Sequence, residues 1–219
     1  METIYPVLHP PNAGFPFTVT IPKDQKASKE IGSADTSVTK IYCNRSGLNA
    51  KAGAASVITR LGHVINVSHY HLGTLTKYTT FDAKAVGVSL ALQQLLHAVN
   101  PGRTTICLNN QAVLLALHQH VPKTGQFVMT KIHKLINDAY RKHLQLGEDF
   151  GLDVRWITGH TGVKWNEMAD VEVKEASGGK VSGDVLLPLF LCAGQQLPIS
   201  VGAECQKLEK ECKMMWREQ

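Results

Sequence analysis

Residues 104–119, TTICLNNQAVLLALHQ, contain the signals of a buried strand followed at once by a helix. β-favouring and apolar residues run to Leu108, two asparagines follow, and apolar residues then recur at helical spacing. In a sheet of parallel strands joined by helices, ligands bind at the carboxyl ends of the strands. Asn109 and Asn110 therefore stand where the sequence predicts a functional site.

The segments on either side extend this pattern into a mixed α/β domain. Three β-rich runs separated by glycine-containing turns come first, and amphipathic helical patterns alternate with short strands afterwards. We expect strands at 39–43, 52–59, 64–71, 104–108 and 153–157, and helices at 26–33, 80–99, 110–119, 127–146, 164–176 and 200–216. This order predicts a mixed sheet of about five strands with helices on both faces.

Prolines and glycines indicate where the domain begins and ends. Five of the nine prolines fall within residues 1–23. We expect residues 1–38 to form an extended arm with a short helix, and residues 39–178 to form the α/β domain. Residues 179–219 are predicted to be a linker and a C-terminal helix that packs on the domain. Cys205 and Cys212, seven residues apart on one face of that helix, are expected to be buried by this packing.

Composition excludes some classes of protein. The chain of 219 residues is 43% hydrophobic and has no apolar run of about 18 residues, which a membrane-spanning helix would need. The first residues lack the layout of a signal peptide. Five cysteines form no CxxC pair, which favours a reducing compartment, so we expect an intracellular protein, cytoplasmic or nuclear. The net charge of +5 permits an anionic partner without requiring one, and the sequence does not indicate an oligomeric state.

Four segments, in chain order, resemble the ribonuclease H domain, most closely that of fungal non-LTR (LINE-type) retrotransposons. They are IYCNRSGLNAKAGAASVI (41–58), LGTLTKYTTFDAKAVGVSLAL (72–92), ICLNNQAVLLAL (106–117) and WITGHTGVKWNEMADVEVK (156–174). The resemblance implies a ribonuclease H-like fold with a five-stranded mixed sheet. It also implies a retrotransposon-derived chain that was later domesticated.

The same resemblance implies an altered active site. Ribonuclease H enzymes cut the RNA strand of an RNA–DNA hybrid with two Mg²⁺ ions, which four carboxylates hold. Those four positions correspond to Asn44, Lys84, Asn109 and Asp170, and only the last is an acid. Replacing two Asp and one Glu by Asn, Asn and Lys changes the formal charge of these positions from −4 to 0. Because Mg²⁺ requires anionic oxygen ligands, the resemblance implies no Mg-dependent cleavage, no metal and no cofactor.

The leading hypothesis is a catalytically inactive module that binds an RNA–DNA hybrid or RNA. The resemblance aligns His160 with a histidine that assists product release, and Asn110 and Gln111 with positions that touch the backbone of the hybrid. Together with Arg45 and Ser46, these residues are expected to contact phosphates.

Two other classes of function fit the sequence. One is a repurposed enzyme that binds a small-molecule ligand in the emptied pocket, with Lys84, His160 and Asp170 as acid–base groups. The other is a protein-interaction domain that docks through the arm and the terminal helix. In the binding or structural roles, Lys84 and Asp170 are expected to form an internal ion pair, hydrogen-bonded by Asn44 and Asn109.

Other acids and histidines of the sequence are less suited to bind a metal. Glu167 directly follows Asn166 ahead of Asp170 and is not expected to replace a lost carboxylate. His69 and His71 alternate on a predicted strand and so face one side, but without a third ligand nearby they favour a surface role over a metal site.

Overall fold

A computed structural model of the chain describes residues 1–4, 16–119, 123–148, 150–159, 163–193 and 195–217. A six-stranded sheet with the order β1-β6-β5-β2-β3-β4 forms its centre. Strands β2 (Thr39–Leu48), β3 (Lys51–Arg60) and β4 (His63–Thr74) form an antiparallel meander. Strands β5 (Arg103–Leu108), β6 (Gly151–Trp156) and β1 (Thr18–Thr20) continue from β2, each parallel to its neighbour. The predicted mixed α/β architecture is confirmed.

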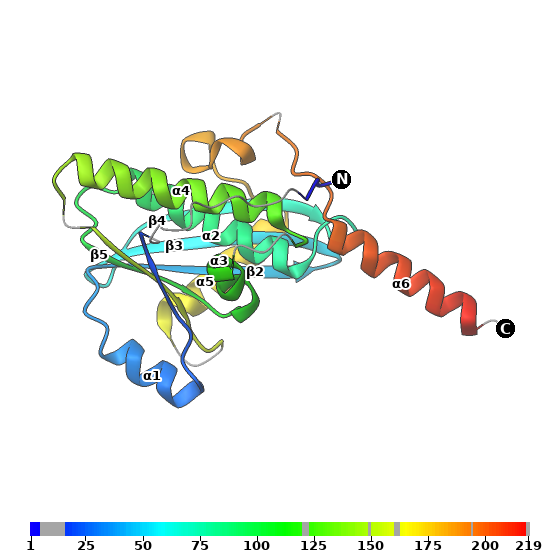
Figure 1. Cartoon of the computed structure of the whole chain (residues 1–219), viewed down its shortest axis with the longest axis horizontal. Coiled ribbons are helices and arrows are strands. Elements are labelled where there is room, and N and C mark those ends of the chain that lie inside the picture. The colour runs from blue at the N-terminus through cyan, green and yellow to red at the C-terminus, as the bar shows by residue number, and fades with distance from the viewer. Residues whose placement is uncertain (5–15, 120–122, 149, 160–162, 194, 218–219) are drawn as a thin grey trace.

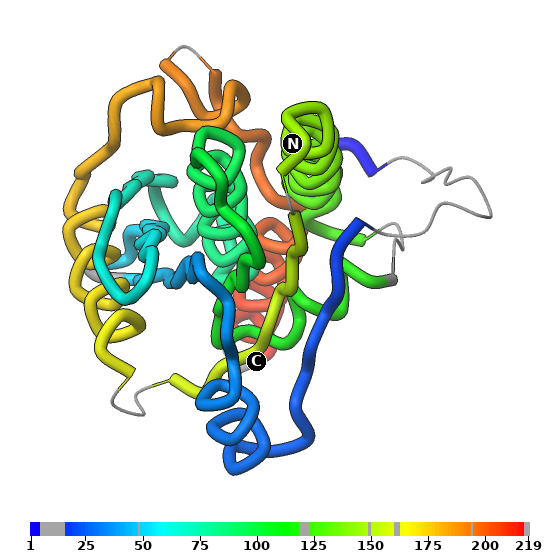
Figure 2. Tube along the Cα trace, turned by 90° about the vertical axis from the view of Figure 1, so that its left-hand side faces the viewer, coloured from blue at the N-terminus to red at the C-terminus, as the bar shows by residue number. Residues whose placement is uncertain are grey.

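Helices cover both faces of this sheet, as predicted (Figure 1). Helix α2 (Thr80–His97) lies on one face with α4 (Gln126–Gln145) beside it, and Figure 2 shows these two helices side by side. Helix α5 (Lys164–Ser177) packs on β2 and β3 from the opposite face. The remaining helices are α1 (Gln25–Ser33), α3 (Gln111–Gln119) and α6 (Val201–Arg217), with short 3₁₀ turns at Asp184–Leu186 and Leu189–Leu191.

A capping box fixes where α2 begins. The Thr79 hydroxyl accepts a hydrogen bond from the backbone N–H of Asp82, and the Asp82 carboxylate accepts one from the backbone N–H of Thr79. This reciprocal pair satisfies amide groups that the first turn of a helix leaves without partners. Gly87, about two turns into the helix, lies close to β2, where a Cβ on it would make an ordinary contact of 3.5 Å with Cys43 Cβ. Lys84 is thereby held on the face of α2 that meets the sheet.

The prediction of five strands missed β1. Residues 18–20 of the N-terminal arm pair in parallel with residues 153–155 of β6, so part of the arm is the edge strand of the sheet. A strand of three residues next to prolines has too little periodicity to be recognised in the sequence. The rest of the arm, residues 5–15, lies outside the described residues.

The C-terminal helix packs on the domain only through its first turn, contrary to the prediction. Ala203 is buried, whereas every residue from Cys205 to Trp216 is exposed, and Figure 1 shows α6 extending away from the body. Cys205 and Cys212 are therefore exposed thiols and not buried ones. In the part of the chain that the structure describes, no helix combines the length and the apolar character that crossing a membrane requires.

Substitution of two glycines can test how closely helices α5 and α2 pack on the sheet. A Cβ on Gly53 of β3 would lie 2.4 Å from the backbone nitrogen of Ser177, at the end of α5. Because backbone atoms cannot move aside, we expect Gly53→Ala to lower the free energy of unfolding by about 1–3 kcal/mol, measured by urea denaturation.

The matched control is Gly87→Ala, whose Cβ would make only ordinary contacts at 3.5 Å. We expect this change to be neutral, or to stabilise the helix by roughly 0.5–1 kcal/mol. Equal stabilities of the two variants would contradict the close packing of α5 on β3.

Candidate functional site

Most of the predicted site residues meet in one open cleft, at the carboxyl ends of β2 and β5. The cleft has a volume of about 630 Å³. Its walls are formed by Asn44, Arg45, Ser46, Gly47, Lys84, Asn109, Asn110, Glu167, Asp170, Val171, Val173 and Lys174. Gln111 does not line the cleft, because it begins α3 with an exposed side chain. His160 falls outside the described residues.

The Lys84 side chain lies at the centre of this arrangement. It is only 4% exposed, and its ammonium group donates hydrogen bonds to the Oδ1 atoms of both Asn44 and Asn109. Asn44, 3% exposed, also accepts a hydrogen bond of 2.8 Å from the backbone N–H of Arg45. The predicted hydrogen bonds between Lys84 and the two asparagines are therefore present. One lysine of α2 connects Asn44, which lies within β2, to Asn109, which directly follows β5.

Burial weakens the charge of this amine. Removal from water, the largest cause, and the nearby Arg45 cation together lower the pKa of Lys84 from its ordinary value to about 8. The Asp170 carboxylate acts in the opposite direction and has a smaller effect on the Lys84 pKa. Asp170 thus attracts Lys84 through its charge, while the direct hydrogen bonds of the amine go to neutral amide oxygens.

Helix α5 forms the opposite wall of the cleft. Glu167, Asp170 and Lys174 are spaced by three and four residues and so share one face of the helix. The end of α5 is fixed to β2 where the Ser177 hydroxyl donates to the Ser46 carbonyl at 3.2 Å. The cleft therefore contains the cations Arg45, Lys84 and Lys174 against the carboxylates Glu167 and Asp170.

Glu167 and Lys174 are cleft residues that the sequence analysis missed. Glu167 belongs to the Asn-Glu pair before Asp170, and this position in the motif predicts no metal-ligand role for it. Helical spacing was a usable signal, since residues three and four apart from Asp170 must lie on the same face of α5.

A second group of titratable side chains lies between β4 and α5. The ligand atoms of His69, Glu172 and Glu175 all lie within 4.8 Å of one another. His69 Nε2 is 2.7 Å from a Glu172 oxygen, and the Lys180 ammonium lies 3.7 Å from the same oxygen while it binds Glu175. His71 turns elsewhere, with its Nδ1 3.0 Å from the Ala176 carbonyl. Lys180 offsets one of the two carboxylate charges of this group, which keeps a formal charge of −1 when His69 is neutral.

Comparison with solved structures finds ribonuclease H domains. Ribonuclease H1 of Halobacterium salinarum is 15% identical with a TM-score of 0.48, over 65% of this chain and 98% of that one. LC11-RNase H1, isolated from compost, is 17% identical with a TM-score of 0.49, over 65% and 97% of the two chains. The PFV ribonuclease H domain is 16% identical with a TM-score of 0.49, over 67% and 98%.

No family model or curated protein matches the sequence. The predicted mixed α/β fold class is correct: an antiparallel meander continues into parallel strands, and helices cover both faces of the sheet.

The lowered pKa of Lys84 predicts a specific dependence of stability on pH. Between pH 8 and 10.5 the unfolded chain still carries the lysine proton that the folded chain has lost, so the Lys84 contribution to the free energy of unfolding rises with pH. The full rise from this residue amounts to about 3 kcal/mol. Burial raises the pKa of the Cys43 and Cys107 thiols, and these two groups lower the free energy of unfolding in the upper part of the same pH range. We therefore expect urea denaturation at several pH values to show the rise as a difference, the free energy of unfolding of the wild type minus that of Lys84→Met.

Lys174→Met is the matched control, because Lys174 lines the same cleft with an exposed side chain. This variant should keep the rise. The same pH dependence in Lys84→Met as in the wild type would contradict the burial of a titrating Lys84 amine.

Proposed function

We propose that this chain is a catalytically inactive ribonuclease H-like module that binds nucleic acid, an RNA–DNA hybrid or RNA, without a metal. The observation that carries the proposal is the Lys84 ammonium group, which is hydrogen-bonded to the side chains of Asn44 and Asn109. A covalently attached cation there leaves the cleft able to attract phosphate groups without Mg²⁺. Arg45 and Lys174 add positive charge along the cleft walls.

The donor set does not fit a two-Mg²⁺ centre. Mg²⁺ prefers several anionic oxygens in near-octahedral order, and among the described residues that line the cleft only Glu167 and Asp170 are acids. The Lys84 ammonium also binds the two amide oxygens that would otherwise be ligands, and its charge repels a cation. We therefore propose no step of Mg-dependent RNA cleavage for this chain.

Phosphate contacts are assigned to the groups on the β2 side and the α3 side of the cleft. Arg45 and Ser46 extend β2 into the cleft wall, and Asn110 stands at the start of α3. The Asn110 side-chain oxygen already accepts a hydrogen bond of 3.1 Å from the backbone N–H of Val113. This bond fixes the orientation of the Asn110 side chain next to the cleft. Gln111 and His160 are proposed as further phosphate contacts on the basis of the sequence motifs alone.

The alternative of a repurposed enzyme receives less support. The pKa of Lys84 near 8 suits acid–base chemistry, but the amine is bound to two amide oxygens. Trp165 does not line the cleft; it packs against the Tyr42 and Ala169 side of the core, with the Lys164 amine 4.3 Å from the centre of its ring. Among the described residues that line the cleft, none is aromatic, so they form no aromatic wall that would enclose a small molecule.

The fungal retrotransposon origin is part of the same proposal and rests on the four sequence motifs. Asp→Asn, Glu→Lys and a Gly→Arg change at Arg45 are each reachable by one G-to-A change in a codon. An excess of such transitions in the coding DNA would support domestication of a mutated transposon copy, and its absence would count against this history.

Binding of a fluorescently labelled RNA–DNA hybrid, followed by anisotropy, tests the proposed function. We expect binding in EDTA and in Mg²⁺ with equal affinity, and weaker binding as the salt concentration rises. Arg45→Ala should weaken binding and lower the slope of log K against log salt by about 1, because one phosphate contact is lost.

The matched control is Arg103→Ala. Arg103 has an exposed side chain at the start of β5, the opposite end of the strand that precedes Asn109. This change removes the same charge away from the cleft and should have little effect on binding. No binding at low salt, a requirement for Mg²⁺, or equal losses in the two variants would each contradict the proposal.

A further inference from the structure

Helix α6 presents an uncovered surface beyond the domain. Its first turn is held against the body, where Gly202 lies next to Thr79 and Thr124 and Ala203 is buried. From Cys205 to Trp216 the side chains are exposed (Figure 1). The backbone N–H of Ser200, just before the helix, donates to the Lys77 carbonyl at 3.1 Å, and the Ser200 carbonyl accepts from the backbone N–H groups of Ala203 and Glu204. These bonds hold the start of the helix and so set the direction in which its exposed part extends.

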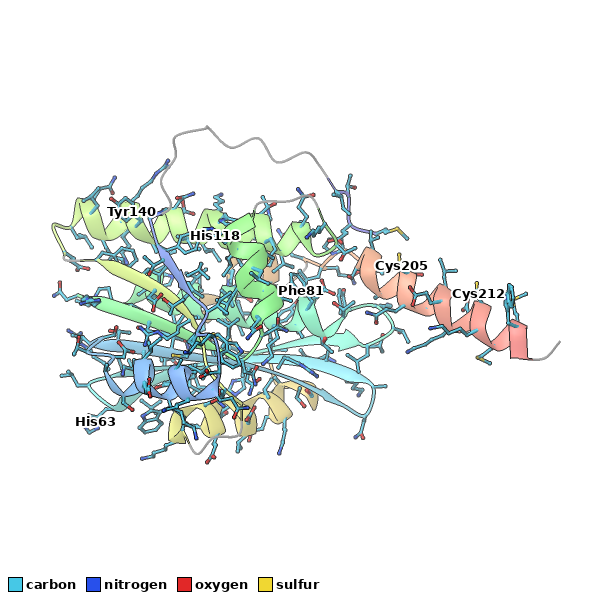
Figure 3. The ribbon with its side chains drawn as sticks, turned by 60° about the horizontal axis from the view of Figure 1, so that its bottom comes forward. His63, Phe81, His118, Tyr140, Cys205 and Cys212 are labelled. Atoms are coloured by element: carbon cyan, nitrogen blue, oxygen red, sulfur yellow. The ribbon has the colours of Figure 1, made fainter. Side chains whose placement is uncertain are left out.

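One side of this exposed part is apolar. The α6 stripe, as we call it, consists of Cys205, Leu208, Cys212, Met215 and Trp216. The first four follow each other at spacings of three, four and three residues, the a/d pattern of helices that pair with another helix. Leu208, Met215 and Trp216 are 57%, 65% and 84% exposed. Figure 3 shows the Cys205 and Cys212 side chains on the same side of α6.

The acidic and basic residues of α6 lie at different angles from this stripe. At 100° per residue, Glu209 lies about 70° to one side of the centre of the stripe, and Glu204 and Glu211 lie roughly 70–90° to the other. Lys207, Lys210 and Lys213 lie further round, towards the opposite side. The acids therefore occupy the positions that flank a helix–helix interface, and the bases do not.

We propose that the α6 stripe docks an amphipathic helix of a partner protein whose apolar side is bordered by Lys or Arg. Basic residues at the flanking positions of the partner would face Glu204, Glu209 and Glu211, which sets both the choice of partner and its orientation. This inference stands independently of the proposed function, because it uses no residue of the cleft.

The charge pattern disfavours two other occupants of the stripe. In a parallel pair of identical helices, Glu204 of one copy would face Glu209 of the other, and like charges at these positions oppose association. On an anionic membrane, the acids that border the stripe would lie at the level of the negative headgroups. A basic helix is the occupant whose charges complement all three acids.

Two designed peptides of the length of α6 test this proposal on the full chain under reducing conditions. Both carry leucine at the a and d positions, and the flanking e and g positions are lysine in one peptide and glutamate in the other. We expect the lysine peptide to bind about tenfold or more tightly than the glutamate peptide, measured by anisotropy of the labelled peptide. Leu208→Asp should abolish this binding.

Met214→Ser provides the matched control, because Met214 is exposed on α6 but lies away from the stripe. It should bind the lysine peptide like the wild type. Since Leu208 and Met214 are both exposed, thermal midpoints of both variants should equal that of the wild type.

Four outcomes would overturn the proposal. They are equal binding of the two peptides, binding of neither, self-association of the chain that Leu208→Asp abolishes, and Leu208-dependent binding to phosphatidylserine vesicles.

Discussion

The cleft of this protein depends on one buried cation, the ammonium group of Lys84. Two strand ends and helix α2 converge there, and each of Asn44 and Asn109 directs an amide oxygen at the same point. Oxygens gathered in this way require a positive charge or a proton donor, because buried polar atoms without partners are costly. Lys84 meets this requirement from within the chain.

The Lys84 ammonium group is a cation that belongs to the chain, so the carboxylates of the cleft do not depend on a bound metal for a nearby positive charge. A site of four carboxylates needs bound metal to offset their repulsion, whereas this cleft balances its own charges with its own side chains. Burial of Lys84 opposes its protonation and lowers its pKa, and the charge of Asp170 partly offsets this effect. The two amide oxygens accept hydrogen bonds from the ammonium group. The result is a permanently assembled polar surface at the place where the parallel strands end.

Much of the fold could be predicted from the sequence, because alternation, helical periodicity and glycine-containing turns all act locally. The helices α1 to α6 and four of the five strands were predicted within about three residues of their observed bounds, whereas β2 extends to Leu48, five residues beyond its predicted end at Cys43. Strand β1 was missed since its partner β6 lies more than a hundred residues away in the chain. The exposure of α6 was missed because an apolar stripe on a helix predicts that this side is buried. The stripe does not tell whether the domain itself or another protein covers it.

The site was predicted through motifs and not through geometry. The four motifs brought Asn44, Lys84, Asn109 and Asp170 to one cleft, as expected. They gave no indication that Glu167 and Lys174 share its wall, because that depends on which face of α5 meets the cleft. The division of the chain at residues 38/39 and 178/179 stays a prediction, and β1 ties part of the arm to the sheet.

The most direct test of the central role of Lys84 is an NMR titration with Mg²⁺ that follows the backbone amides of residues 44, 84, 109 and 170. We predict no saturable shifts at millimolar Mg²⁺ in the wild type. A variant with Asn44→Asp, Lys84→Glu and Asn109→Asp restores four carboxylates and should show such shifts. Saturable shifts of all four amides in the wild type would contradict the account, because they would mean that the cleft binds a metal despite the lysine.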